Sequence, residues 1–236
     1  MNLILVDGHD FVSETTVVLR DRRFNHVTQI HRAQLQDELR VGRIDGLMGT
    51  ALVTRIDENE IELTVNLHRE PPPPLNLTLF LALPRPKFLA KVLQTVTSLG
   101  VKEIYLMNSY RVEKVYWSCQ QITPEEIRRA CLLGLEQAKD TKLPRVHLRP
   151  LFKPFVEDEL PSLINGAEAL VAHPVAEVEC PRGITERPIA LAIGPEGGFI
   201  DYEIEKLNRA GFRSVRLTSR ILKVETAVAT LIGRLT

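Results

Sequence analysis

Residues 75–107 have the sequence LNLTLFLALPRPKFLAKVLQTVTSLGVKEIYLM, which holds two apolar runs on either side of a helical repeat. Leu75–Leu83 is almost continuously apolar, which is typical of a strand buried on both faces of a parallel sheet. Apolar residues then recur three and four positions apart, so we predict a helix over Lys87–Leu99 that ends at Gly100. Glu103–Met107 is predicted as the next strand. The order strand, helix, strand predicts an α/β unit.

The same alternation continues to the end of the chain. Further buried strands are predicted at Val146–Leu151, Ala169–Ala172, Ile189–Ile193 and Ser214–Leu217. Further helices are predicted at Pro124–Lys139, Phe155–Leu163, Asp201–Ala210 and Val224–Leu235. The expected fold class is therefore α/β, with a parallel sheet and helices on both of its faces.

Four consecutive prolines, Pro71–Pro74, form the clearest boundary, because such a run is stiff and cannot donate ladder hydrogen bonds. We expect one domain over residues 1–74 and a second over residues 75–236. The first contains short β-rich runs separated by turn residues, which predicts a small, largely β barrel or sandwich. Its expected elements are strands at Asn2–Val6, Thr15–Leu19, Thr50–Ile56 and Glu60–Leu67 and a short helix at His31–Leu39.

The composition is that of an ordinary soluble globular protein, with 44% hydrophobic and 25% charged residues in a chain of 236. Three cysteines outside any CxxC spacing indicate free thiols in a reducing compartment, not a disulfide framework or zinc site. With no signal peptide or membrane span predicted, we expect a cytoplasmic protein with no membrane partner. The net charge is zero, and only Arg20–Arg43 is locally basic, so charge alone favours a solvated face over nucleic-acid binding.

The strongest local signal is Gly194–Gly198, GPEGG, which follows the predicted strand Ile189–Ile193. In open α/β sheets ligands bind at the carboxyl ends of strands, and glycines let a backbone approach a ligand closely. The spacing is neither that of a dinucleotide-binding G-x-G-x-x-G nor that of a phosphate-binding P-loop. From periodicity alone, a ligand loop and a simple connecting turn are both open.

A second segment, Leu217–Ala227, leads from a predicted strand end through a short polar loop into an alanine- and valine-rich helix. Its charged residues are Arg220, Lys223 and Glu225. Taken alone, they indicate no more than a solvated helix start.

Together, GPEGGF at 194–199 and RILKVETA at 220–227 resemble the signature of the RsmE family, within the SPOUT methyltransferases. The resemblance extends along most of the chain. Other matching segments are His26–Arg32, Val41-Gly42, Asp45-Gly46, the helix and strand that lead to Ser109 and Arg111, Glu136-Gln137 and Leu143-Pro144. The chain departs from the family at Thr218-Ser219, where Leu-Gly is usual, at Lys223, where Arg is usual, and at Ala138 and Asp140.

The resemblance implies an N-terminal PUA-like β-barrel that binds RNA and a SPOUT domain whose C-terminal segment forms a trefoil knot. It implies S-adenosylmethionine as cofactor, no metal, a homodimer, and methylation of N3 of a uridine in 16S ribosomal RNA on the small ribosomal subunit. The cofactor residues carried over are Leu170, Val171, Ala172, His173, Gly194, Pro195, Glu196, Gly197, Gly198, Leu217, Thr218, Ser219, Ile221 and Leu222.

Neutral uracil N3 is a poor nucleophile, so a nearby cation is expected to stabilise negative charge on the carbonyl oxygens. Arg220 is the candidate, with Lys223 second; Glu196 or Glu225 could accept the proton or could instead brace backbone amides. The expected phosphate contacts are Arg20, Arg22, Arg23, Arg32, Arg85 and Lys87. Two alternatives remain: an inactive RNA-binding relative, and a nucleotide- or NAD-dependent enzyme, against which the missing dinucleotide fingerprint counts.

Overall fold

The computed structural model describes residues 2–184 and 186–236. The chain forms two compact units. The N-terminal unit runs up to Pro73 and also includes Leu132–Leu143, whereas the C-terminal unit comprises Pro74–Cys131 and Pro144–Thr236. A single boundary in the sequence could not anticipate that Leu132–Leu143 packs with the N-terminal unit. In the part of the chain that the structure describes, no helix is long and apolar enough to cross a bilayer.

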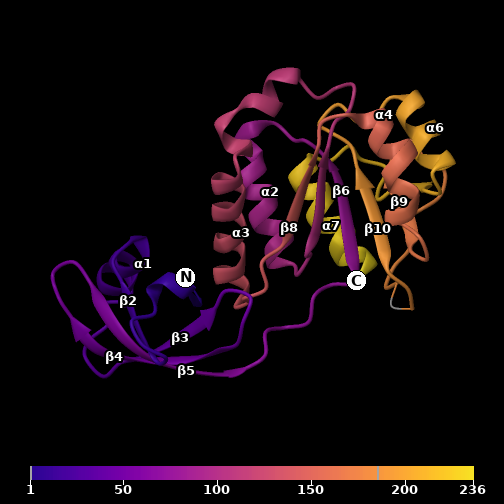
Figure 1. Ribbon diagram of the computed structural model, residues 1–236. Helices are drawn as coiled ribbons and strands as arrows, with labels where there is room; N and C mark the ends of the chain where they lie inside the picture. Colours follow the sequence, from indigo (N-terminus) through magenta and orange to yellow (C-terminus); the bar gives the residue numbers. More distant parts are fainter. Residues whose placement is uncertain (1, 185) are drawn as a thin grey trace. The chain divides into compact units, whose positions relative to one another are not determined.

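The N-terminal unit is built on a curled five-stranded sheet with the strand order β1-β3-β4-β5-β2 (Figure 1). All neighbours pair antiparallel except β1 and β3, which are parallel. The strands are β1 Ile4–Val6, β2 Thr16–Leu19, β3 Glu38–Arg43, β4 Met48–Ile56 and β5 Ile61–Arg69, with a 3₁₀ turn η1 at Gly8–Asp10. Alternate side chains of these strands, including Val53 and Leu63, form one buried core.

The helix predicted at His31–Leu39 is wrong. The helix of this region lies earlier: Asp21 caps α1, Arg22–Asn25, by accepting a hydrogen bond from the Arg23 amide, and the chain continues in the π-helical turn η2, His26–Ile30. The last two residues of the predicted segment, Glu38 and Leu39, begin β3 instead. Strand β3 has only Val41 and Gly42 buried, so its pairing with β1 and β4, more than its apolar pattern, determines its conformation.

The C-terminal unit is built on a six-stranded sheet with the order β11-β9-β10-β6-β7-β8, in which every pair is parallel. Its strands are β6 Leu77–Ala82, β7 Glu103–Met107, β8 Arg145–Arg149, β9 Glu168–Ala172, β10 Ile189–Ile193 and β11 Arg213–Val215. All five residues of the central strand β10 are buried, as its continuous apolar sequence predicts.

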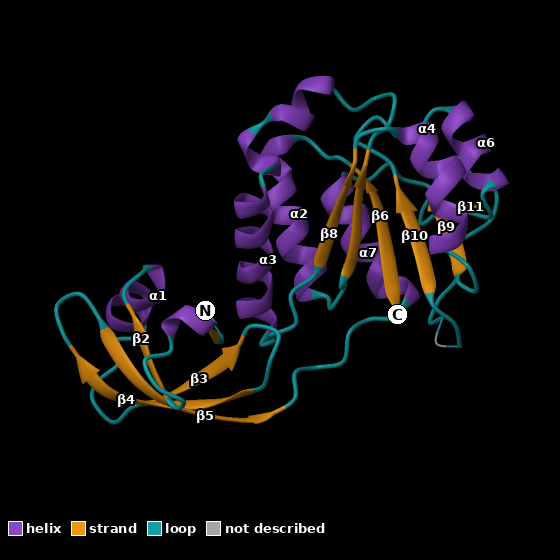
Figure 2. Cartoon of the chain, viewed as in Figure 1, coloured by secondary structure: helices purple, strands orange, loops and turns teal. Residues whose placement is uncertain are grey.

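Helices cover both faces of this sheet (Figure 2). Helices α2 (Pro86–Ser98) and α7 (Val224–Leu235) pack together on one face with the first half of α3 (Pro124–Ala138). The other face carries α6 and a continuous helical segment. Their bounds are α4 Phe152–Pro154, η5 Phe155–Glu159, α5 Leu160–Leu163 and α6 Asp201–Arg209; η3 Lys114–Ser118 and η4 Gln120–Ile122 are short 3₁₀ helices. The predicted α/β fold with a parallel, helix-flanked sheet is confirmed.

Because the six strands are parallel, their carboxyl ends lie at one edge of the sheet. The loops after β6, β7, β9, β10 and β11 therefore begin at this edge, where open α/β sheets bind their ligands. Strand order decides which loops are neighbours: β10 lies between β9 and β6, and β7 lies beyond β6.

Candidate active site

A cavity of about 350 Å³ lies at the carboxyl edge of the parallel sheet. Its volume is within the range of small-molecule sites. Segments far apart in the sequence contribute to its wall. The lining residues are Arg111, Ala172, His173, Pro174, Val175, Ile193, Gly194, Pro195, Glu196, Gly197, Gly198, Phe199, Leu217, Thr218, Arg220, Ile221, Leu222, Val224, Ala227 and Leu231.

The loop after β10 makes a tight turn that needs its glycines. The Gly198 amide donates to the Pro195 carbonyl oxygen at 2.7 Å, and Gly198 has a φ of +74°, which side chains other than glycine rarely adopt. A Cβ atom on Gly194 would lie 2.9 Å from the backbone nitrogen of Phe199. The backbone of this loop therefore folds over itself at a distance that only glycine permits, and the residues of the loop line the cavity.

Most of the predicted cofactor residues meet in this cavity. Ala172, His173, Gly194–Gly198, Leu217, Thr218, Ile221 and Leu222 all line it. Three of the predicted residues do not. Leu170 and Val171 are fully buried in β9, where they belong to the core, and Ser219 is exposed without lining the cavity.

The four predicted catalytic residues divide into two pairs. Arg220 and Glu196 line the cavity and are exposed, whereas Lys223 precedes α7 as its N-terminal cap residue and Glu225 lies in the first turn of that helix, outside the lining. Glu196 also braces a neighbouring loop, because its Oε1 accepts a hydrogen bond from the Arg85 amide at 3.0 Å. The bracing role that the sequence left open for Glu196 is therefore present.

Arg111 lines the cavity as well, although no role for it was predicted from the sequence. Arg111 follows β7, two strands from β10, and its guanidinium donates to the Gly197 carbonyl oxygen. The apolar face of α7 was missed as well. Val224, Ala227 and Leu231 line the cavity and lie three and four positions apart, so they share one face of the helix. That spacing was visible in the sequence; the neighbourhood of Arg111 and Gly197 was not.

His173 lines the cavity just after β9, and its surroundings disfavour the protonated imidazole. Partial burial lowers the pKa of His173 below its ordinary value of 6.5, although Asp201 acts weakly in the opposite direction. At neutral pH the neutral form of this imidazole therefore predominates.

Residues 71–236 match the family model of the RNA methyltransferase domain. The chain belongs to this RNA methyltransferase family. Among its relatives, the ribosomal RNA small subunit methyltransferase E of Treponema pallidum is 27% identical over 237 residues, covering 96% of this chain and 87% of that protein. The enzyme of the same name from Synechocystis is 26% identical over 230 residues, covering 94% of this chain and 73% of the relative.

Solved structures of RNA methyltransferases share the fold. A ribosomal RNA small subunit methyltransferase E from Neisseria gonorrhoeae, solved bound to S-adenosylmethionine, superposes with a TM-score of 0.74 at 22% identity and covers 99% of this chain and 95% of that one. A probable rRNA methyltransferase from Porphyromonas gingivalis gives a TM-score of 0.74 at 20% identity, with 98% and 95% covered.

Proteins position nucleic acids largely through phosphate contacts, and the structure argues against one of the predicted contacts, Arg23. Its guanidinium is buried and donates to both carboxylate oxygens of Asp10 at 2.7 Å, to Asp21 and to the Leu5 carbonyl oxygen. Burial alone would lower the pKa of Arg23, but these hydrogen bonds to Asp10 and Asp21 raise it above its ordinary value. With its donors occupied inside the N-terminal unit, Arg23 is a structural residue.

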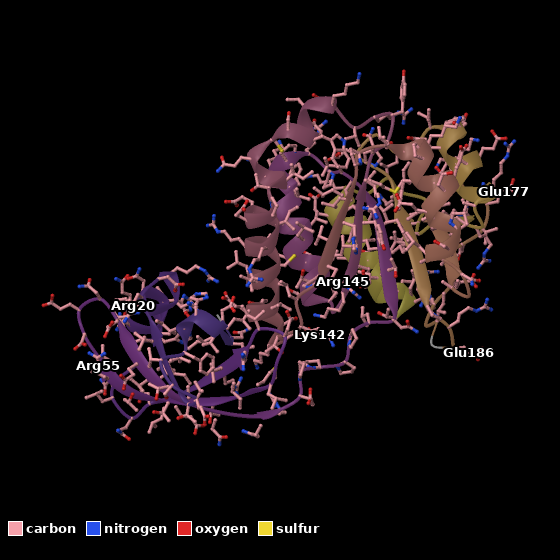
Figure 3. All side chains as sticks on the ribbon, viewed as in Figure 1. Arg20, Arg55, Lys142, Arg145, Glu177 and Glu186 are labelled. Atoms are coloured by element: carbon pink, nitrogen blue, oxygen red, sulfur yellow. The ribbon has the colours of Figure 1, made fainter. Side chains whose placement is uncertain are left out.

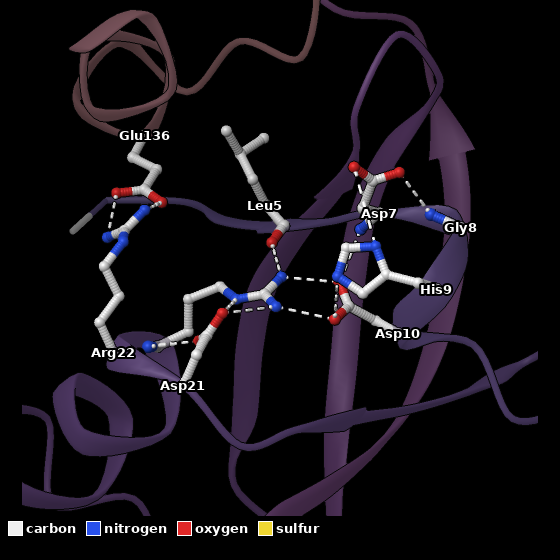
Figure 4. A network of polar contacts seen from close by, with 9 residues as sticks. Leu5, Asp7, Gly8, His9, Asp10, Asp21, Arg22 and Glu136 are labelled. Atoms are coloured by element: carbon white, nitrogen blue, oxygen red, sulfur yellow. Dashed lines mark hydrogen bonds and ion pairs between the residues drawn. The ribbon is translucent and has the colours of Figure 1, made fainter. Parts of the chain in front are cut away.

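Arg22 is engaged as well, because it forms a bidentate pair with the buried carboxylate of Glu136, with an Nη1 to Oε2 distance of 3.0 Å (Figure 4). Arg20 pairs with Glu60 at 2.8 Å and remains largely exposed on the part of the unit that also carries Arg55, another partner of Glu60 (Figure 3). Arg32, Arg85 and Lys87 are all exposed. Within residues 2–184 and 186–236, no cluster of His, Cys, Asp or Glu side chains has the make-up of a metal site.

Proposed function

We propose that this protein transfers the methyl group of S-adenosylmethionine to N3 of a uridine in 16S ribosomal RNA, with the small ribosomal subunit as substrate. The observation that carries the proposal is the cavity in which the glycine loop Gly194–Gly198, the loop after β9 and the segment Leu217–Leu222 meet. Membership of the RNA methyltransferase family gives the reaction class. The names of the relatives give the ribosomal small subunit as the substrate class.

The residues of the cavity fit S-adenosylmethionine. Gly194 and Gly198 permit the tight turn of the loop at the cavity wall, and the amide and carbonyl groups of such a loop can recognise the edge of an adenine ring. Val175, Ile221 and Leu222 supply apolar surface for its faces. When bound, the cofactor supplies an electrophilic methyl group on a sulfonium.

The role of the protein in this reaction is to make the uracil ring nucleophilic and to hold it in line with the methyl group. Arg220 is exposed at the wall of the cavity, where its cation can stabilise negative charge on the carbonyl oxygens of the base. Glu196 is the proton acceptor that borders the cavity, although it also braces the Arg85 amide. Lys223 and Glu225, at the start of α7 and outside the lining of the cavity, are second candidates for these two roles.

The RNA must present an unstacked base before its ring nitrogen can be methylated. Arg20 and Arg32 in the N-terminal unit, and Arg85 and Lys87 in the C-terminal unit, are the proposed phosphate contacts, because all four are exposed. Arg22 can contribute only in competition with Glu136. Phosphate contacts position an RNA without reading its sequence, so target choice would come from the shape of the ribosomal subunit.

Several finer features belong to the same proposal: a PUA-like N-terminal domain over residues 1–74, a SPOUT domain over residues 75–236, a C-terminal trefoil knot, a homodimer and a cytoplasmic location. The knot is supported by the path of the chain after β10, which reaches β11 beyond β9 and returns in α7 to α2. The dimer is supported by two apolar side chains at the cavity, Ile221 and Val175, which are 85% and 79% exposed.

Isothermal titration with S-adenosylmethionine and, separately, with NAD tests the cofactor assignment. We expect saturable binding of S-adenosylmethionine and none of NAD. A folded protein that binds neither would favour the inactive RNA-binding alternative, in which Thr218-Ser219 and Lys223 mark a lost site. Binding of NAD alone would reject the methyltransferase assignment.

A further inference from the structure

Helix α6 contains a carboxylate that is buried and accepts hydrogen bonds at both of its oxygens. Glu203 is only 2% exposed, although it is a charged residue in the first turn of a helix. Its Oε2 accepts hydrogen bonds from the Ile200 amide at 3.0 Å and from the Ser109 hydroxyl at 3.1 Å. Its Oε1 accepts a hydrogen bond from the Tyr110 amide at 2.7 Å. Three donors around a buried carboxylate offset the loss of its hydration.

These donors come from two separate loops, and both loops border the candidate active site. Ile200 closes the loop that follows β10, whose residues Gly194–Phe199 line the cavity. Ser109 and Tyr110 belong to the loop after β7, 94 and 93 residues away from Glu203 in the sequence. The carboxylate therefore joins two loops that begin at different strands.

Arg111 is the residue that this junction directs toward the cavity. It follows the clamped Ser109 and Tyr110 directly, lines the cavity and donates to the Gly197 carbonyl oxygen. The other end of the loop is held too, since the Asn108 amide donates to the Arg149 carbonyl oxygen at 2.9 Å. Without the carboxylate, the loop would lose the two hydrogen bonds that hold Ser109 and Tyr110 to helix α6.

Ordinary helix capping does not account for Glu203. In a capping box the side chain at the third helical position accepts a hydrogen bond from the amide of the cap residue, and Glu203 makes this one contact with Ile200, whose own side chain has no acceptor. The hydrogen bonds from Ser109 and Tyr110 are additional. Burying a charged side chain to make them costs hydration, which fits a role of Glu203 in placing the β7 loop at the site.

We propose that Glu203 is a positioning residue, whose carboxylate fixes the Ser109–Arg111 loop against the Gly194–Phe199 loop so that Arg111 is held at the cavity. This inference rests on the proposed methyl transfer in that cavity for its catalytic consequence. The coupling of the two loops is a statement about structure that can be tested without any turnover.

Glu203→Gln is the primary variant, because glutamine keeps the shape but has one acceptor oxygen and turns an amide NH₂ toward one of the backbone donors. Glu205→Gln is the matched control: Glu205 lies on the same helix, is exposed and pairs with Arg209 four residues later. Hydrogen exchange of the segments 108–112 and 194–200 should accelerate in Glu203→Gln and stay at the wild-type rate in Glu205→Gln. Ser109→Ala, which leaves the helix cap intact, should accelerate exchange at 108–112 only.

Kinetics then separate positioning from a purely structural role. The assay is run below the melting temperature of Glu203→Gln. There, the loss of a hydrogen bond to a charged group should reduce kcat for methyl transfer about 10- to 100-fold. Because the effect acts through Arg111, the same substitution in an Arg111→Ala background should reduce kcat by less than about twofold.

Unchanged exchange at 108–112 in Glu203→Gln would overturn the loop coupling. A lower melting temperature with wild-type kcat would overturn the positioning role and leave an ordinary helix cap. Fully additive effects of Glu203→Gln and Arg111→Ala would likewise contradict it. If the wild-type protein transferred no methyl group, the proposed function would fail by itself, and the exchange measurements would still decide whether Glu203 couples the loops.

Discussion

Gly194→Ala is the smallest substitution that should distort the glycine loop at the wall of the cavity. The added Cβ would lie 2.9 Å from the Phe199 backbone nitrogen and 3.2 Å from both the Gly198 carbonyl carbon and the Phe199 ring. Two of these neighbours are backbone atoms of the same loop, so the loop itself must move. Overpacking of this kind costs about 1–3 kcal/mol. If cofactor binding requires the observed loop, its affinity should fall about 5- to 150-fold.

Titration calorimetry with S-adenosylmethionine measures that loss directly, with a thermal melt to show that the variant is folded. Gly233→Ala is the matched control, because no atom lies within 4 Å of its added Cβ on helix α7, and it should bind like the wild type. Wild-type affinity in Gly194→Ala would refute the reasoning that this turn shapes the cofactor site. At Gly197 the nearest atom is Arg111 Cδ at 2.8 Å, a flexible side chain, so Gly197→Ala should be milder.

Three further outcomes are expected. Arg220→Ala should lower methyl transfer by more than about 100-fold while calorimetric affinity for S-adenosylmethionine stays near wild type; a parallel loss of affinity would argue against charge stabilisation as its role. Arg23→Ala should destabilise the protein by about 3–5 kcal/mol in urea unfolding, because it leaves the buried Asp10 carboxylate without its guanidinium partner, whereas Arg55→Ala, with its pairs at the surface, should shift the midpoint far less. Because the lowered pKa of His173 means that the unfolded chain binds the proton more tightly, wild-type stability should fall as pH drops from 6.5 through the lowered pKa. His173→Asn should lose that part of the pH dependence, and identical pH profiles would contradict it.

The secondary structure of the C-terminal unit was predictable because its strands are buried and its helices amphipathic. Glu103–Met107 and Ile189–Ile193 coincide with β7 and β10 for this reason. Strand β3 was not predictable in the same way. Its sequence ELRVGR places only two residues in the core, so hydrogen bonding to its neighbours outweighs local pattern.

Much of the site followed from the motif, but its boundary did not. The resemblance to the family implied the whole strand end Leu170–His173 as cofactor residues, but Leu170 and Val171 are buried in the core. The motif also gave no role to Arg111, which is 86 residues from Gly197 in the sequence. Arg111 reaches Gly197 because β7 and β10 are separated by only one strand in the sheet. Arg23 shows the opposite error, since a basic stretch in the sequence does not reveal that acidic side chains already surround one of its cations.

The central claim is the reaction itself, and identifying the methylated nucleoside tests it most directly. Small ribosomal subunits that lack the modification would be incubated with the protein and labelled S-adenosylmethionine, and the digested RNA would be analysed by mass spectrometry. We predict a single labelled nucleoside, 3-methyluridine, derived from 16S ribosomal RNA. Label in a different nucleoside, or none from a protein that binds the cofactor, would contradict the account.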